Sequence, residues 1–121
     1  MKLFIIGVVT VYAGVYVGCP LYCDTNGSLF YSSETEPWIA LDVLLYENDW
    51  AKCGDEILVI TPGGRRVYRA YDAGPLYKYY LEDHPDLPII GDIPAFLAPF
   101  EGLSSTAMLI NLTRVKEAYV E

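Results

Sequence analysis

The chain has 121 residues, 53% of them hydrophobic, and a formal net charge of −8. This length fits one domain spanning residues 1–121, and so apolar a composition excludes a disordered chain. Nucleic-acid binding is excluded as well, because it requires clustered Lys and Arg to neutralise phosphates. The one basic cluster, Arg65, Arg66 and Arg69, alternates with apolar residues inside a predicted strand.

Residues 2–17 are predicted to form the first strand, because most of them are β-branched or aromatic. A second interpretation is a secretory signal, since Lys2 precedes an apolar run that reaches the small residue Ala13. The strand is favoured, because a single lysine is a weak signal-peptide start. No other segment approaches the ~20 apolar residues of a membrane span, so no membrane span is expected.

The cysteines are Cys19, Cys23 and Cys53. Cys19 and Cys23 have no second pair and no nearby histidine, so neither a metal nor any other cofactor is expected. The single histidine, His84, lies in a loop-like stretch and is interpreted as solvated; one histidine makes a Ser-His-Asp or Cys-His site hard to build. The odd cysteine count leaves either one disulfide and one thiol, or three thiols.

The next segments predict a loop and then strands. Residues 19–36 read as a polar loop, residues 38–46 as a strand or a short helix, and residues 47–54 as a connector. The clearest unit is residues 56–70, "EILVITPGGRRVYRA", in which two β-rich runs flank Pro-Gly-Gly. This turn chemistry predicts a β-hairpin.

The last third mixes loop and regular structure. Residues 74–88 contain three prolines and are predicted to form a loop. Residues 91–103, "GDIPAFLAPFEGL", predict one short helix, because proline is tolerated in a first turn and Gly102 can end a helix. Residues 107–120 predict a final strand or a pair of strands.

The stretch "RAYDAGPLYKYY", residues 69–80, places a carboxylate among aromatic residues. Asp72 follows a predicted strand directly, Gly74-Pro75 then breaks the chain, and Tyr71, Tyr77, Tyr79 and Tyr80 surround it. Tyrosine rings offer flat apolar faces to sugar rings, and a carboxyl with apolar neighbours retains its proton more readily.

Several motifs in order resemble one family. They are "TVYAG", "PWIALD", "CGDEILVI" followed by "GGRRVYRAYDAGP", "IIGDIPAFLAPF" and "STAMLINLTRV". Together they resemble the domain of rare lipoprotein A and, more distantly, expansins, barwin and small inverting endoglucanases. The resemblance covers nearly the whole chain and implies a mainly β fold, a six-stranded double-psi β-barrel with one or two short helices. We expect one core that includes Tyr12, Val59, Val67, Leu97 and Leu109.

The resemblance also implies a polysaccharide groove with carboxylates on its floor. Asp72 matches the Asp-x-Gly-Pro motif of the lytic centre, and Asp92 matches the general acid of the endoglucanases. Glu34 or Glu36 matches a further glutamate, and Tyr71, Tyr77 and Tyr79 are predicted to bind substrate. An active enzyme would be a lytic transglycosylase or a glycoside hydrolase with Asp72 as acid. The resemblance further implies a disulfide between Cys53 and either Cys19 or Cys23.

The chain departs from the family pattern at two positions. Ala73 stands where the family has arginine, and Asp42 stands where it has a histidine. Structural roles are therefore the competing interpretation. Asp72 could cap backbone amides near Gly74-Pro75, and Asp92 could cap the predicted short helix.

The function predicted from the sequence is a module that binds or cleaves a peptidoglycan-like cell-wall glycan, with or without catalysis. One alternative is a structural protein of a virion, tail or extracellular assembly, whose partners would be other subunits of that assembly. Another is a secreted binder without catalysis. The expected location is extracellular, in the cell envelope or in a virion, with the cytoplasm kept as an alternative.

Overall fold

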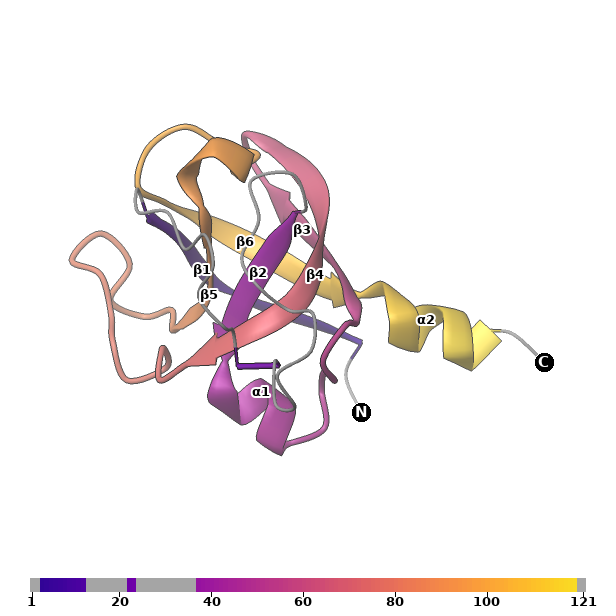
Figure 1. Cartoon of the computed structure of the whole chain (residues 1–121). Helices are drawn as coiled ribbons and strands as arrows, with labels where there is room; N and C mark the ends of the chain where they lie inside the picture. Colours follow the sequence, from indigo (N-terminus) through magenta and orange to yellow (C-terminus); the bar gives the residue numbers. More distant parts are fainter. Residues whose placement is uncertain (1–2, 13–21, 24–36, 120–121) are drawn as a thin grey trace.

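The computed structural model describes residues 3–12, 22–23 and 37–119 (Figure 1). Six strands close into a barrel in the order β1-β5-β2-β4-β3-β6. The strands are β1 (Phe4–Tyr12), β2 (Trp38–Asp42), β3 (Glu56–Thr61), β4 (Gly64–Gly74), β5 (Ile89–Pro94) and β6 (Ser104–Asn111). Within the described ranges the α-helices are α1 (Val43–Glu47) and α2 (Leu112–Tyr119), and η1 (Ala95–Leu97) is one 3₁₀ turn. The predicted fold class is confirmed: a mainly β, closed six-stranded barrel with two short α-helices.

Two parallel strand pairs lie within this barrel. β1 runs parallel to β5 and β2 runs parallel to β4, whereas the contacts β2–β5, β3–β4, β3–β6 and β1–β6 are antiparallel. Closure pairs each of the six described strands on both sides, so this barrel has no open edge to offer to another chain. Four neighbouring strands, β1, β5, β2 and β4, therefore present one continuous outer surface.

The core lies inside the barrel and follows the two-residue period of the strands. Val59, Leu109 and Leu97 are buried in one cluster, as predicted. Val67 was predicted to join them, and this is wrong. Its side chain is 38% exposed, because it pairs with Leu58 on the outer face while the neighbouring residue of β4 faces inward. The side chain of Tyr12 lies outside the described part.

The helix predicted over residues 91–103 is wrong. Residues up to Pro94 belong to β5, and only Ala95–Leu97 form a 3₁₀ turn. The pairing of β5 with β1, in which Thr10 lies opposite Asp92, prevails over the local helix signal. Asp92 therefore sits within a strand and caps no helix.

Other segments divide between strand and helix. The alternatives for residues 38–46 are both realised, as β2 is followed directly by α1. The hairpin over residues 56–70 is confirmed by the antiparallel pairing of β3 with β4, and β4 continues to Gly74. The final segment is a strand only to Asn111. There Asn111 Oδ1 accepts the Arg114 N–H at 3.1 Å, which caps the start of α2.

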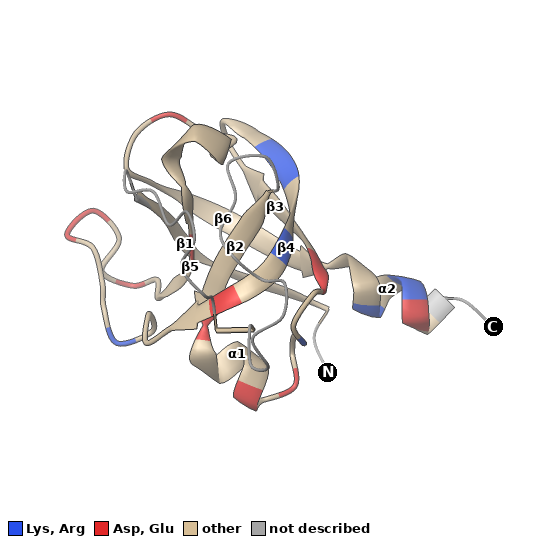
Figure 2. Ribbon diagram, viewed as in Figure 1, with Lys and Arg blue, Asp and Glu red and all other residues tan. Residues whose placement is uncertain are grey.

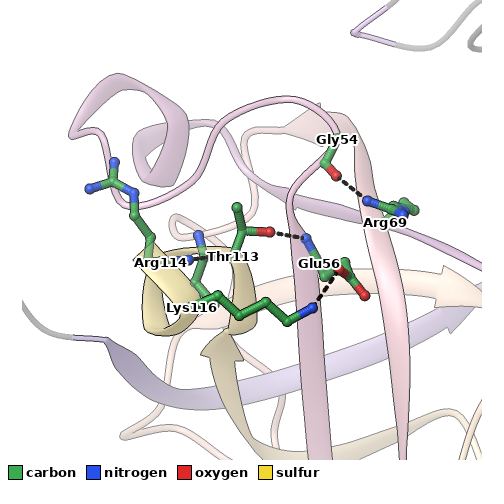
Figure 3. Close-up of polar contacts among 7 residues, drawn as sticks. Gly54, Glu56, Arg69, Thr113, Arg114 and Lys116 are labelled. Carbon is green, nitrogen blue, oxygen red and sulfur yellow. Dashed lines mark hydrogen bonds and ion pairs between the residues drawn. The ribbon is translucent and has the colours of Figure 1, made fainter. Parts of the chain in front are cut away.

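Polar contacts hold α2 against the barrel (Figure 3). Thr113 Oγ1 accepts the Glu56 N–H at 2.9 Å, and Lys116 Nζ lies 3.0 Å from Glu56 Oε1. Arg114 donates to the carbonyl of Asp49, and nearby Arg69 donates to the carbonyl of Gly54. These contacts keep the basic residues of α2 at the end of β3 and β4 where Glu56 lies opposite Arg69.

Candidate functional site

Four residues form a row across the outer surface of the barrel. Thr10 of β1 lies opposite Asp92 of β5, Asp92 opposite Ala40 of β2, and Ala40 opposite Asp72 of β4. Their chain neighbours Ile39, Leu41 and Ile93 are fully buried in the core, so the row faces outward. Asp72 and Asp92 are two strands apart, about 10 Å between Cα atoms by the usual strand spacing. We call these four residues the carboxylate row.

Asp92 has the most perturbed carboxyl of the row. Burial raises its pKa to about 6, and the negative charge of Asp72 acts in the same direction. The hydroxyl of Thr10 opposes this shift, since it donates to Asp92 Oδ1 at 2.8 Å and so favours the charged form. A carboxyl with such a pKa keeps its proton in a large fraction of molecules near pH 6, which suits a general acid.

Asp72 has a structural contact as well. Its Oδ1 accepts the Tyr22 N–H at 2.9 Å. The adjacent Cys23 donates its N–H to the carbonyl of Tyr71 at 3.0 Å and is bridged to Cys53. Asp72 therefore fastens the described piece of the first loop to β4, together with the disulfide. The disulfide expected for Cys53 is formed with Cys23.

Asp42 performs the capping that the sequence suggested for Asp72 near Gly74-Pro75. Asp42 is only 1% exposed, and its Oδ1 accepts the N–H groups of Leu76 and Tyr77, each at 2.7 Å. Its Oδ2 accepts the Leu44 N–H at 3.0 Å at the start of α1. This position, where the family has histidine, thus has a structural role in this chain.

The aromatic residues lie in two places. Tyr71 is half-buried against Trp38 and Ala40, next to the row. Beside Asp72, the rings of Tyr22 and Tyr46 are 5.3 Å apart, and the Tyr46 hydroxyl donates to the Asp72 carbonyl at 2.8 Å. Tyr77 lies apart from both places, in the loop after β4. Its burial, and to a lesser extent the negative charge of Asp42, raises the pKa of the Tyr77 hydroxyl.

The predicted site residues are therefore only partly brought together. The structure places Asp72, Asp92 and Tyr71 near one another. Tyr77 lines hollows beside Asp42 and beside Phe4, and Tyr79 is 54% exposed in the loop after β4. Glu34 and Glu36 lie outside the described residues.

Sequence reasoning missed Thr10, and it also missed Tyr22 and Tyr46. Thr10 is the one hydroxyl in the apolar run from Phe4 to Val11, and this was the only available signal. Its partner is 82 residues away along the chain, so the strand register was needed to connect the two.

Within residues 3–12, 22–23 and 37–119, no cluster of three or more His, Cys, Asp or Glu side chains could hold a metal ion. No helix in the same ranges has the length and apolar character needed to cross a membrane. In comparisons with known proteins, no protein family, no curated protein and no solved structure matches the chain significantly.

Proposed function

We propose that the chain is a cell-wall glycan module of the rare lipoprotein A type, which binds and cleaves a peptidoglycan-like polysaccharide along the carboxylate row. One observation carries the proposal: Asp72 and Asp92 share one outward face, and Asp92 has a pKa of about 6. In this proposal Asp92 replaces Asp72 as the proton donor, because the surroundings of Asp92 favour the protonated carboxyl.

The chemistry needs one proton donor and one negative charge. Asp92 would protonate the oxygen of the leaving sugar, which a carboxyl of raised pKa does efficiently near its pKa. In hydrolysis Asp72 would activate a water molecule, and inverting enzymes separate the two carboxyl groups by roughly 6.5–9.5 Å. In lytic cleavage a hydroxyl of the sugar itself attacks. Asp92 alone would then act in turn, first giving its proton to the leaving oxygen and then, as the carboxylate, taking up the proton of the attacking hydroxyl.

Two further features support a glycan module outside the cytoplasm. Tyr22 is 47% exposed beside Asp72 and its ring packs on the more deeply buried Tyr46, so the Tyr22 ring can stack on a sugar. The chain has a Cys23–Cys53 disulfide, and disulfides persist mainly in oxidising compartments outside the cytoplasm. An extracellular or cell-envelope location follows from the proposal.

The test is cleavage of purified peptidoglycan, followed by loss of turbidity and by chromatography of the released fragments. We expect the wild type to be most active near or below pH 6, where Asp92 still carries its proton. Asp92→Asn should lower the rate by roughly 10²–10⁴-fold while sedimentation with peptidoglycan is retained.

Glu101→Gln is the matched control, because it also removes one negative charge, from an exposed residue outside the row. Its activity should equal that of the wild type. A wild type that neither sediments with peptidoglycan nor clears it contradicts the proposed function. Full activity of Asp92→Asn contradicts the role of Asp92.

A further inference from the structure

The other side of the barrel carries an unusual outer surface. Outward residues of β1, β6, β3 and β4 pair with one another in two adjacent rows. The apolar members of these rows, which we call the apolar face, are Phe4, Ile6, Leu58, Ile60, Val67, Met108 and Ile110. Their chain neighbours Ile57, Val59 and Leu109 fill the core, so the apolar face points away from it.

Along the strands of a barrel in water, apolar residues that point inward normally alternate with polar residues that point outward. Here β1, β3 and β6 are apolar on both sides, a pattern typical of strands that are covered on both faces. Phe4 is 48% exposed and Ile6 is 54% exposed, so within the described residues the surface is incompletely covered. Contiguous exposed apolar residues mark interaction sites.

Positive charge borders the apolar face on one side. Arg65 lies opposite Ile60 in the β3–β4 pairing and Arg69 lies opposite Glu56, so both continue the outer surface across β4. Figure 2 shows separate blue segments along β4 and on α2. Five of the chain's 8 Lys and Arg residues lie on these two elements: Arg65, Arg66, Arg69, Arg114 and Lys116. A partner for this border should be acidic.

The chain itself contains an acidic segment that also carries exposed aromatic residues. The connection between β4 and β5, residues 75–88, projects from the barrel on the side away from α2 (Figures 1 and 2). Its exposed tyrosines, Tyr79 and Tyr80, are followed by three exposed acids, Glu82, Asp83 and Asp86. We call residues 75–88 the acidic tyrosine loop.

We propose that the apolar face binds the acidic tyrosine loop of a second copy of this chain. The aromatic rings would cover the exposed Phe4 and Ile6, while the acids would face the arginines of β4. An open hollow of about 310 Å³ lies at the β1 border of the apolar face, lined by Phe4, Ile5 and Ile6 and by Tyr77 at the base of the same copy's loop. It offers a socket for a ring of the second copy's Tyr79 or Tyr80.

This contact joins two different surfaces, so each copy keeps one unused face and one unused loop. Such head-to-tail contacts give rings or open chains rather than closed dimers. The contact is independent of the proposed glycan function, because the carboxylate row shares no residue with the apolar face or with the acidic tyrosine loop, although both surfaces include residues of β1 and β4.

Sedimentation velocity of the full chain tests the proposal. The mass of the wild type should rise with concentration between ~1 µM and ~1 mM, the range of moderate protein affinities. Ile6→Lys and the double variant Tyr79→Ser, Tyr80→Ser should each weaken association by roughly 30-fold, as removal of a central contact does. Leu103→Lys is the matched control, because Leu103 is 81% exposed but lies outside both surfaces, and it should associate like the wild type.

A mixing experiment identifies the two surfaces. Ile6→Lys keeps an intact loop and the double tyrosine variant keeps an intact apolar face. An equimolar mixture should therefore form a 1:1 dimer at concentrations at which each variant alone is still monomeric. Val67→Lys replaces Ile6→Lys if circular dichroism shows that the latter is unfolded. A wild type that is monomeric at every concentration overturns the second copy as partner. A mixture that stays monomeric overturns the acidic tyrosine loop as the counter-surface.

Discussion

Replacing Asp92 by asparagine should stabilise the folded protein at neutral pH. Burial is the main reason that the pKa of the Asp92 carboxyl rises from the ordinary 3.8 to about 6. A tenfold change in proton affinity corresponds to about 1.4 kcal/mol, so a pKa raised from 3.8 to about 6 sets a ceiling of about 3 kcal/mol on the folding free energy lost by ionising Asp92. Asp92 keeps some contact with solvent, and screening should reduce this to about 1–2 kcal/mol.

The direction of the pH dependence follows from the raised pKa. Below about pH 4 the carboxyl is protonated in both folded and unfolded chains, and it contributes no difference. As the pH rises to about 6 the unfolded chain loses the proton first, so the wild type loses stability relative to Asp92→Asn. The asparagine oxygen can still accept the Thr10 hydroxyl bond, so the comparison isolates the proton.

The assay is urea unfolding at several pH values between 4 and 7 for wild type, Asp92→Asn and the control Glu101→Gln. The stability difference between Asp92→Asn and wild type should grow over this interval. The difference between Glu101→Gln and wild type should stay constant with pH. A difference that is constant from pH 4 to pH 7 would refute the raised pKa. Carbon NMR titration of the Asp92 carboxyl gives the pKa directly, and Asp72→Asn should lower it, because the charge of Asp72 helps to raise it.

Two further predictions concern stability alone. Asp42→Ala should lower the free energy of unfolding by about 3–5 kcal/mol in urea, because three backbone N–H groups lose a buried charged acceptor; a loss below about 1 kcal/mol would contradict this role. Reduction of the Cys23–Cys53 bridge, whose ends are 30 residues apart, should lower the free energy of unfolding by about 3–4 kcal/mol, because the open chain regains loop entropy. Mass spectrometry that shows three free thiols in unreduced protein would contradict the bridge.

Features set by a few neighbouring residues could be predicted from the sequence. The hairpin of β3 and β4 follows from two β-rich runs around Pro62-Gly63, because turn residues and strand propensity act locally. The inward position of Val59 and Leu109 follows from the alternation along their strands. The barrel as a whole required the resemblance, since its six strands pair over long distances in sequence.

Features set by strand register could not be predicted. In residues 91–103 the local signals for a helix, Asp92 and Pro94, were real, but the pairing of β5 with β1 gave this segment partners that a helix would lack. The same limit applies to the two aspartates near Gly74-Pro75. Proximity in sequence favoured Asp72 as the cap, whereas the parallel pairing of β2 with β4 places Asp42 opposite Gly74, within reach of the next amides.

The strand β1 connects the two surfaces to which we assign roles. Near its start, Phe4 and Ile6 belong to the apolar face, and near its end Thr10 belongs to the carboxylate row. Strand rise is about 3.3 Å per residue, so Ile6 and Thr10 are roughly 13 Å apart along β1. At that distance, Ile6→Lys should weaken self-association while the pKa of Asp92 stays near 6, because a solvent-exposed charge beyond about 10 Å is largely screened in 0.1 M salt. A marked fall of that pKa in Ile6→Lys would mean that the two surfaces are coupled through β1.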